Sequence, residues 1–379
     1  MKKILIVTER RADYSKFRQI LFAIEKSNKL DYELVVTGSH LLKKHGYTIN
    51  EIKKDGFKIS KLFNMYGKKP NYTSSDMCRA FGKCILEITK IVEKSKPDII
   101  LSGFDIGANL AASIVGAHMN IVVGHVEGGD ATGSIDEPIR HAITKFAHIH
   151  FTSNKLSTKR LIQMGENKKF IFTVGSPAID NIKKIKKIKK SVLQQQFKLD
   201  LDSPFLILIQ HTVTSEIDYV DKNMKIILNA ITECDIPTII ISGNADAGSK
   251  KITNKFLSSN FKVFPTITNE QYINLLKYSV CLIGNSSSGI IETPFLHVPS
   301  INIGTRQNKR LHSNSTIDVD YNKAEIKNAI NKILNNKKFR KKINRDLGLY
   351  GDGNSSKKII SILENLDLKS IPIQKVLVY

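Results

Sequence analysis

A buried strand, a glycine turn and an amphipathic helix follow one another in the middle of this chain, and this pattern constrains the fold most strongly. The apolar run 121–123 is typical of a strand covered on both faces in a parallel sheet. Gly128 and Gly129 then allow a sharp turn. After Pro138, the apolar residues Ile139 and Ile143 recur at helical spacing. Because such strand–helix pairs recur along the chain, we expect an α/β fold with doubly wound parallel sheets.

The first half alternates strand and helix patterns. Strands are expected at 3–8, 31–38, 57–63, 97–105 and 149–153, and helices at 17–24, 79–93 and 109–118. Residues 10–15 are expected to form the loop after the first strand. Each strand-to-helix loop then lies at the carboxyl edge of a parallel sheet, where open α/β folds bind ligands.

The alternation pauses at 175–195 and then restarts. In the second half, strands are expected at 205–210, 237–242, 261–264, 281–284 and 300–303, and a final helix at 354–368. We therefore expect two Rossmann-like domains, residues 1–180 and 181–353, around a central cleft. The C-terminal residues 354–379 are expected to pack back on the first domain.

Composition and charge exclude several classes of protein. The chain has 379 residues, 41% of them hydrophobic, with no apolar run long enough for a membrane span. The apolar segment 4–7 is too short for a signal peptide, so we expect a cytoplasmic protein. The four cysteines have neither zinc nor redox spacing and are expected to be reduced thiols.

The net charge is +23, and the densest basic runs are 183–190 and 337–342. The run 183–190 contains no aromatic residue that could stack a nucleic-acid base, and the run 337–342 contains a single one, Phe339. We interpret both runs as solvated helix faces, and the basic field as one that would steer an anionic substrate inwards. No nucleic-acid or membrane partner is expected.

Charged residues gather in the loop and helix that follow the central strand. They are His125, Glu127, Asp130, Asp136, Glu137, Arg140 and His141. Two acids at a helix start are commonly explained by the helix dipole. The helix dipole does not explain His125 and Glu127, which precede the glycine turn, so we favour a functional site here. Another expected strand ends in Asp105, which would lie at the same sheet edge.

Polar loops also follow the expected strands of the second half. They are 210–214, 243–250, 283–289 and 303–307. The Gly-Asn-Ser-Ser-Ser-Gly loop at 284–289 would direct backbone N–H groups at an anion. Such loops are also common helix caps. With His211 and Arg306 at neighbouring strand ends, a diphosphate site is the better hypothesis. Glu292 either accepts bonds from ribose hydroxyls or is an ordinary surface glutamate.

Eight motifs together resemble the hydrolysing UDP-N-acetylglucosamine 2-epimerases of sialic-acid biosynthesis, including the epimerase half of the bifunctional animal enzyme. They are Arg-Ala-Asp-Tyr-Ser (11–15), Val-Glu-Gly-Gly (126–129), Ile-Asp-Glu-Pro-Ile-Arg-His-Ala-Ile-Thr-Lys (135–145), Val-Gly-Ser-Pro (174–177), Asp-Ala-Gly-Ser-Lys (246–250), Ile-Gly-Asn-Ser-Ser (283–287), Gly-Thr-Arg-Gln (304–307) and Tyr-Gly-Asp-Gly-Asn (350–354). The resemblance implies a GT-B fold, which agrees with the two Rossmann-like domains expected from the pattern.

The resemblance also implies residue roles. The matched acids for proton transfer are Asp105, Glu127 and Asp136, with His125 beside them and His211 counted in the catalytic set. The matched residues for the nucleoside diphosphate are Arg11, Ser15, His211, Asn244, Asp246, Ser286, Ser287, Glu292 and Arg306. Glu137 and Arg140 are assigned to the sugar region. No cofactor and no metal are implied, and a homodimer or homotetramer is expected.

Two departures from the family pattern affect the substrate. Where the family usually has His-Gly-Asp-Arg, this chain has Gly103-Phe104-Asp105-Ile106, which keeps the acid but loses a cation. Where it usually has His-Pro-Val-Thr, this chain has Thr212 after the histidine. The first change leaves open both the nucleotide and the sugar.

The expected reaction is hydrolysis of UDP-N-acetylglucosamine with inversion at C2, giving N-acetylmannosamine and UDP. Departure of the diphosphate acidifies the C2 proton, a carboxylate removes that proton to give 2-acetamidoglucal, and water then adds. One alternative is the same reaction on a UDP- or GDP-linked diacetamido-trideoxy sugar of the legionaminic-acid pathway. Another is a non-hydrolysing 2-epimerase. An RNA-binding protein fits the charge alone, but acids at the strand ends would repel a polyanion.

Overall fold

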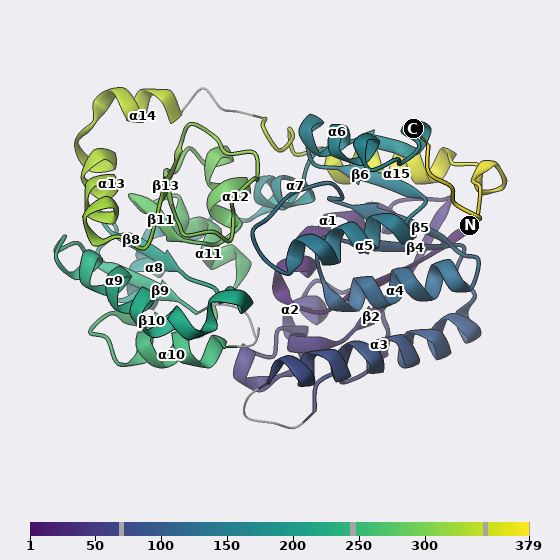
Figure 1. Ribbon diagram of the computed structural model, residues 1–379, viewed down its shortest axis with the longest axis horizontal. Coiled ribbons are helices and arrows are strands. Elements are labelled where there is room, and N and C mark those ends of the chain that lie inside the picture. Colours follow the sequence, from purple (N-terminus) through teal and green to yellow (C-terminus); the bar gives the residue numbers. More distant parts are fainter. Residues whose placement is uncertain (68–71, 243–247, 344–347, 379) are drawn as a thin grey trace. The chain divides into compact units, whose positions relative to one another are not determined.

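The computed structural model describes residues 1–67, 72–242, 248–343 and 348–378. The chain divides into two compact units (Figure 1). Unit 1 comprises 1–131, 135–183 and 350–379, and unit 2 comprises 132–134 and 184–349. Each unit has a parallel sheet with helices packed against it, which confirms the expected α/β class with two Rossmann-like domains.

The sheet of unit 1 follows Rossmann topology. Its strands are β1 (Lys2–Thr8), β2 (Leu30–Val36), β3 (Ile59–Leu62), β4 (Ile99–Gly103), β5 (Val122–Val126), β6 (Ile149–Thr152) and β7 (Ile171–Thr173). They lie in the order β3-β2-β1-β4-β5-β6-β7, and every pair is parallel. The strand order therefore reverses between β1 and β4, and the crevice at that point is where such sheets bind ligands.

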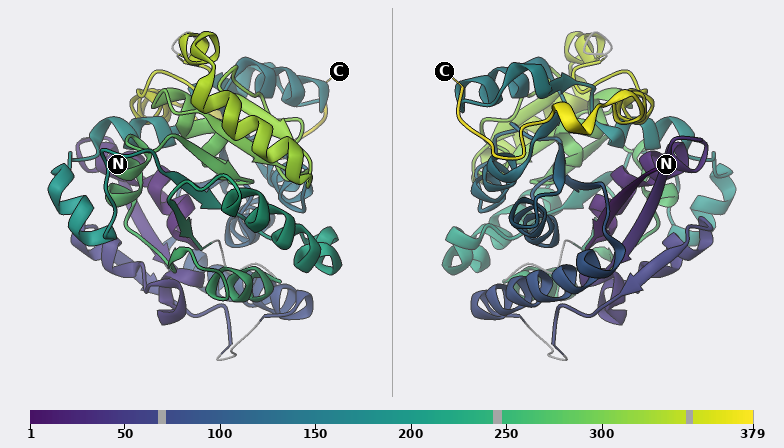
Figure 2. Two further views of the ribbon diagram at one scale, coloured as in Figure 1. Left: turned by 90° about the vertical axis from the view of Figure 1, so that its left-hand side faces the viewer. Right: turned by 90° about the vertical axis from the view of Figure 1, so that its right-hand side faces the viewer.

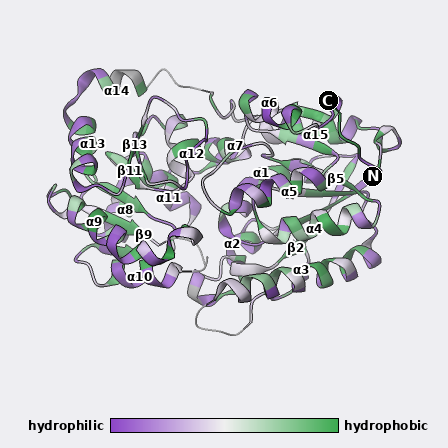
Figure 3. Cartoon of the chain, viewed as in Figure 1, coloured by the Kyte–Doolittle hydropathy of each residue, from purple (hydrophilic) through white to green (hydrophobic). Residues whose placement is uncertain are grey.

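Alternate residues of β1 face two different cores. The helices of unit 1 are α1 (Arg11–Glu25), α2 (Ile49–Lys54), α3 (Ser74–Ser95), α4 (Gly107–His118), α5 (Asp136–Phe146), α6 (Lys155–Gln163), α7 (Pro177–Lys184, which runs into unit 2) and α15 (Ser355–Asn365). Ile4 and Ile6 join the core that includes residues of α1 and α15. Leu5 and Val7 join the core that includes α3 and α4. Because both faces are covered, the central strands of the sheet are mostly apolar, as the hydropathy colours show (Figure 3).

The last helix lies beside the first strand and the first helix of the chain (Figure 2, right). Lys2 Nζ donates hydrogen bonds to the carbonyl oxygens of Leu363, Glu364 and Leu366 at 2.8, 3.1 and 2.6 Å. An ammonium group in this position satisfies carbonyls that the end of a helix leaves unpaired. The N-terminal strand therefore holds α15 in unit 1.

The sheet of unit 2 repeats the same topology. Its strands are β8 (Leu206–Ile209), β9 (Thr238–Ile241), β10 (Lys262–Phe264), β11 (Cys281–Gly284), β12 (Ser300–Ile303) and β13 (Thr316–Val319), in the parallel order β10-β9-β8-β11-β12-β13. Its helices are α8 (Lys190–Phe197), α9 (Val220–Thr232), α10 (Ser249–Leu257), α11 (Asn269–Leu276), α12 (Ser288–Phe295), α13 (Lys323–Asn335) and α14 (Lys337–Ile343). Here the order reverses between β8 and β11, which places a second ligand crevice at that point.

Two local expectations are wrong. Residues 10–15 do not form a loop, because α1 already begins at Arg11. Asp13 accepts the backbone N–H groups of Glu9 and Arg10 at 2.9 and 2.8 Å, so it satisfies donors at the helix start. The helix after Pro138 begins earlier, at Asp136, since proline is tolerated in a first helical turn.

The edge strands β7 and β13 were not predicted. Both are short, with three and four residues, and neither contains a fully buried residue. In the described part of the chain, the helices are too short or too polar to cross a membrane.

Candidate active site

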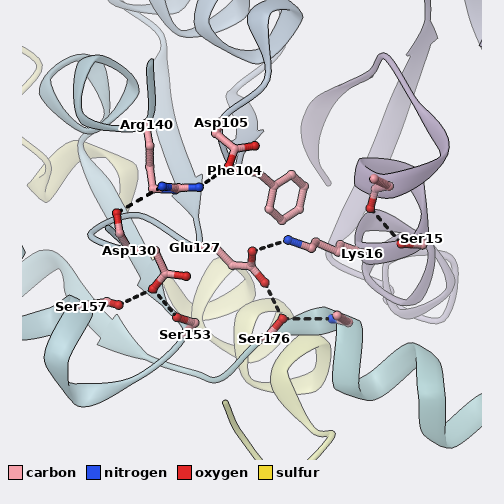
Figure 4. A network of polar contacts seen from close by, with 12 residues as sticks. Ser15, Lys16, Phe104, Asp105, Glu127, Asp130, Arg140, Ser153, Ser157 and Ser176 are labelled. Carbon is pink, nitrogen blue, oxygen red and sulfur yellow. Dashed lines mark hydrogen bonds and ion pairs between the residues drawn. The ribbon is translucent and has the colours of Figure 1, made fainter. Parts of the chain in front are cut away.

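Asp105 and Arg140 form an ion pair at the carboxyl edge of the unit 1 sheet (Figure 4). Asp105 follows β4, and Arg140 lies one turn into α5. Arg140 Nη2 donates to Asp105 Oδ2, and Arg140 Nη1 donates to the carbonyl oxygen of Asp130 at 3.2 Å. The arginine is only 1% exposed, whereas the Asp105 side chain is 19% exposed. A buried cation thus orients a carboxylate that a substrate can still reach.

Glu127 forms a second carboxylate centre, directly after β5. Lys16 Nζ lies 2.5 Å from Glu127 Oε2, and Ser176 Oγ donates to Glu127 Oε1 (Figure 4). The Lys16 ammonium also lies 4.4 Å from the centroid of the Phe104 ring, a cation–π geometry. Both oxygens of Glu127 are therefore oriented by donors from α1 and from the start of α7.

Phe104 and Glu127 both have the left-handed backbone conformation. Their φ angles are +67° and +61°, which non-glycine residues rarely adopt. Such conformations persist where the surroundings fix them, and they concentrate at functional sites. Edge-on packing of the Phe104 ring on Phe17, with ring centroids 5.1 Å apart, holds one of the two in place.

His125 is fully buried on β5, and its ring contacts the backbone of Phe104, next to Asp105. Its Nε2 lies 3.3 Å from the carbonyl oxygen of Phe104, and its Nδ1 lies 3.1 Å from Thr144 Oγ1. Because a carbonyl only accepts, Nε2 carries the hydrogen and Nδ1 accepts from the threonine. Burial lowers the pKa of His125 well below its usual value, and the neighbouring His150 lowers it further. This geometry is that of a neutral positioning residue.

Asp130 is buried and holds the following loop together. Its Oδ1 accepts from Ser153 Oγ at 2.8 Å, from Asn154 Nδ2 at 3.4 Å and from Ser157 Oγ. These donors come from the end of β6 and the start of α6. The loop between β5 and α5 is therefore fixed to the next strand of the sheet.

The other two acids of the central motif lie in the first turn of α5. Asp136 is the first helical residue and is four positions before Arg140, so both lie on one face of the helix. Glu137 pairs instead with His141, at 3.5 Å between Oε1 and Nε2. Glu137 is three positions before Arg140, so it also lies near this face of the helix.

Arg11 and Ser15 lie in the first turns of α1, after β1. Ser15 Oγ donates to the Ala12 carbonyl oxygen at 2.8 Å. Burial raises the pKa of Glu51, and the positive charge of Arg11 opposes this rise, which places Arg11 near that acid. Both residues lie at the start of α1, next to the point where the strand order of the unit 1 sheet reverses.

Asn285 connects the loops at the switch point of unit 2, that is, the place between β8 and β11 where the strand order reverses. It is fully buried after β11. Its side chain accepts from the His211 backbone N–H at 2.7 Å and donates to the His211 carbonyl at 2.9 Å. Its carbonyl oxygen accepts from Arg306 Nη1 at 3.2 Å and from Gln307 Nε2 at 2.9 Å. The Gly133 backbone N–H, also in unit 2, donates to the Arg306 carbonyl at 3.0 Å.

The start of α12 provides hydroxyl and backbone N–H groups at the same edge. Ser286 precedes the helix, and its Oγ accepts the Ser288 backbone N–H at 3.3 Å. Ser287 is the cap residue. Glu292 accepts a hydrogen bond from Ser288 Oγ one turn earlier, which orients its carboxylate. The start of a helix, where the positive end of the helix dipole lies, is a suitable site for an anion.

Position 284 requires glycine, because a Cβ there would lie 2.0 Å from the carbonyl oxygen of Ile209 and its φ is +120°.

Asn244 and Asp246 lie outside the described residues. Among the residues that are described, His, Cys, Asp and Glu side chains nowhere gather in threes close enough to hold a metal ion.

The structure brings the predicted residues together in two sets. Unit 1 joins Asp105 with Arg140 at one carboxylate centre, and unit 2 joins His211 with Arg306 through Asn285. Sequence reasoning missed Lys16 and Ser176, the two partners of Glu127. Their signal was present, because Lys16 directly follows the motif 11–15 and Ser176 lies within the motif 174–177.

Comparison with known proteins places the chain in a family. Residues 22–364 match the family model described as UDP-N-acetylglucosamine 2-epimerase. The chain is 34% identical over 374 residues to the hydrolysing UDP-N,N'-diacetylbacillosamine 2-epimerase of Legionella pneumophila, covering 98% of this chain and 97% of the relative. It is 34% identical over 343 residues to the UDP-N-acetylglucosamine 2-epimerase of Neisseria meningitidis serogroup B, covering 89% of each.

A solved structure shares the fold. The UDP-N-acetylglucosamine 2-epimerase of Neisseria meningitidis, bound to UDP-GlcNAc, matches with a TM-score of 0.83 at 20% identity, covering 95% of this chain and 99% of that chain. The fold is therefore of the GT-B type expected from the sequence. The chain belongs to the UDP-N-acetylglucosamine 2-epimerase family.

Proposed function

We propose that the protein is a hydrolysing 2-epimerase of a UDP-linked 2,4-diacetamido-2,4,6-trideoxy sugar. The observation that carries this proposal is the 34% identity, over 98% of the chain, to the Legionella enzyme named for UDP-N,N'-diacetylbacillosamine. The departure at Ile106 also supports it. That side chain is 3% exposed and belongs to the apolar core, so this position supplies no cation to the substrate.

The proposed reaction starts with loss of UDP. Arg306, His211 and the start of α12 stabilise the leaving diphosphate. As the C1–O bond breaks, C1 gains positive character and the C2 proton becomes acidic. A carboxylate of unit 1 accepts that proton, and the C2–H electron pair forms the C1–C2 double bond of a 2-acetamidoglycal.

The second step is hydration. Water adds its oxygen to C1, and C2 receives a proton on the opposite face, which inverts that centre and releases the free sugar. Asp105, Glu127 and Asp136 are the proposed acids and bases, because opposite faces of the ring require separate groups. Lys16 and Arg140 hold two of these carboxylates in place.

A second candidate is the same hydrolysis on UDP-N-acetylglucosamine, giving N-acetylmannosamine for sialic-acid synthesis. The 34% identity to the Neisseria enzyme over 343 residues favours it. A non-hydrolysing 2-epimerase would use the same elimination but return a nucleotide sugar. Cytoplasmic location and assembly into a homodimer or homotetramer complete the proposal.

The test is product analysis in D₂O with UDP-N,N'-diacetylbacillosamine and UDP-N-acetylglucosamine as parallel substrates. We expect free UDP and a free 2-epimerised sugar with deuterium at C2, formed faster from the diacetamido substrate. Faster formation of N-acetylmannosamine would favour the second candidate. An epimerised nucleotide sugar without UDP release would exclude hydrolysis, and a product without deuterium at C2 would exclude the elimination.

A further inference from the structure

His312, which lies between β12 and β13, has acceptors at both ring nitrogens. Its Nδ1 is 2.8 Å from Asp318 Oδ2, and its Nε2 is 3.0 Å from the carbonyl oxygen of Gln307. A backbone carbonyl only accepts hydrogen bonds, and so does an ionised carboxylate. Both ring nitrogens must therefore carry hydrogen, a condition that only the charged imidazolium meets.

The groups around His312 favour this charged form. Asp318 lies on β13, and its other oxygen accepts from Asn302 Nδ2 on β12 at 2.7 Å. Arg310, in the same segment as the histidine, opposes the charge. Burial lowers the pKa of His312, but Asp318 and the Gln307 carbonyl outweigh burial and raise the pKa above its usual 6.5. Burial likewise raises the pKa of Asp318, and the bonds from His312 and Asn302 lower it overall.

Hydrogen bonds connect His312 to the loops at the switch point of unit 2. His312 contacts the backbone carbonyl of Gln307, which is 1% exposed. The Gln307 side chain in turn donates a hydrogen bond to the Asn285 carbonyl. Arg306 donates to that same oxygen, and the Asn285 side chain holds the backbone of His211. An unbroken path of contacts thus runs from Asp318 to the loops proposed to bind diphosphate.

We propose that His312 is a positioning residue for diphosphate binding. As an imidazolium it fixes the 304–307 loop through the Gln307 carbonyl and adds one positive charge to that region of unit 2. When the pH rises and the ring loses a proton, only one of the two bonds can remain, and the added charge is lost. UDP therefore binds more tightly below the pKa of His312 than above it. This inference rests on the proposed function, because it assumes that these loops bind the nucleotide.

The experiment measures UDP affinity by calorimetry on the full chain between about pH 6 and pH 9. The variants are His312→Gln and Asp318→Asn. The control is His297→Asn, which changes an exposed histidine of unit 2 to a residue that tolerates its φ of +58°. Ionisation of UDP itself is common to all four proteins, so each variant is compared with the unmodified chain at the same pH.

We expect the unmodified protein to bind UDP about three- to tenfold more tightly at pH 6.5 than at pH 8.5. His312→Gln should lose this dependence and match the unmodified protein at pH 8.5. Asp318→Asn should keep the dependence but move its midpoint to lower pH, because the carboxylate that stabilises the imidazolium is gone. His297→Asn should behave like the unmodified protein. Nitrogen NMR should show both His312 nitrogens protonated at pH 6.5.

Three results would overturn the inference: an unchanged pH profile in His312→Gln, an unshifted midpoint in Asp318→Asn, or a neutral His312 ring at pH 6.5. Failure of the proposed function looks different, since none of the four proteins would then bind UDP at any pH. Asp318 is more than half exposed, so Asp318→Asn should fold even if the histidine variant does not.

Discussion

Arg140 reaches Asp105 from a helix that begins 31 residues later in the chain, and the pair joins the segment after β4 to α5 in one polar contact. The arginine is buried, and the carboxylate is partly exposed. A pair of this kind costs free energy to desolvate, so its role is to orient a group rather than to stabilise the fold. Four predictions test this arrangement and the contacts around it.

Asp105→Asn should lower kcat about 100- to 10,000-fold while UDP affinity changes little. Asparagine keeps the shape of aspartate and can still accept from Arg140, but it cannot take a proton. Turnover and calorimetric UDP binding are the measurements. Glu87→Gln, on the outer part of α3, is the matched control and should leave both unchanged. Substantial residual activity in Asp105→Asn would remove this residue from the proposed catalytic set.

Lys16→Met should lower kcat about 100- to 1,000-fold, because Glu127 loses the ammonium that orients it. Methionine has a similar length and retains the apolar contact with Phe104. Steady-state kinetics give the effect on kcat, and thermal unfolding verifies that the variant folds. The control is Lys26→Met, which changes an exposed lysine at the end of the same helix. Equal activity of the two variants would contradict a role for Lys16.

Ile106→Arg restores the charge that the family usually has at this position, yet it should destabilise the protein by more than about 3 kcal/mol. The side chain here is buried among apolar residues of unit 1, with no room for a solvated cation. Chemical denaturation measures the loss, and Ile106→Val should cost only about 1 kcal/mol. A stable arginine variant with tighter UDP binding would show that the position faces the nucleotide after all.

Glu166 should make stability depend on pH in the acid range. Burial alone would raise its pKa, but bonds from His150, Lys145 and Lys375 lower it to about 2. In the unfolded chain the group titrates near 4.5, so between pH 4.5 and 2 the unfolded state binds more protons. The stabilisation is therefore complete above pH 4.5 and is lost as the pH falls towards 2.

The measurement is denaturant unfolding at several pH values. Glu166→Gln should be about 2 kcal/mol less stable than the unmodified protein at pH 6, with the difference shrinking as the pH falls. Glu93→Gln, an exposed change on α3, is the control. A difference that stays constant from pH 6 to pH 3 would contradict the ionised Glu166 cluster.

The sequence by itself determined the architecture. Apolar runs separated by polar loops predicted both sheets and most of their strands, because a strand covered on two faces must be apolar throughout. The same periodicity placed Asp105, His211 and Arg306 at strand ends. The periodicity gave a wrong prediction at residues 10–15. There the Asp13 carboxylate accepts backbone N–H groups at the start of a helix, a contact that apolar periodicity does not reveal.

Only the tertiary structure decided which of these residues act on one another. The partners of Glu127 come from positions 16 and 176, and those of His312 from positions 307 and 318. A side chain's hydrogen-bond partners depend on atoms brought together by folding, so sequence spacing predicts the strand end but not the contact. The charge of a histidine also depends on the tertiary structure. Its pKa is determined by burial and by the groups that face its ring, and not by its position in the chain.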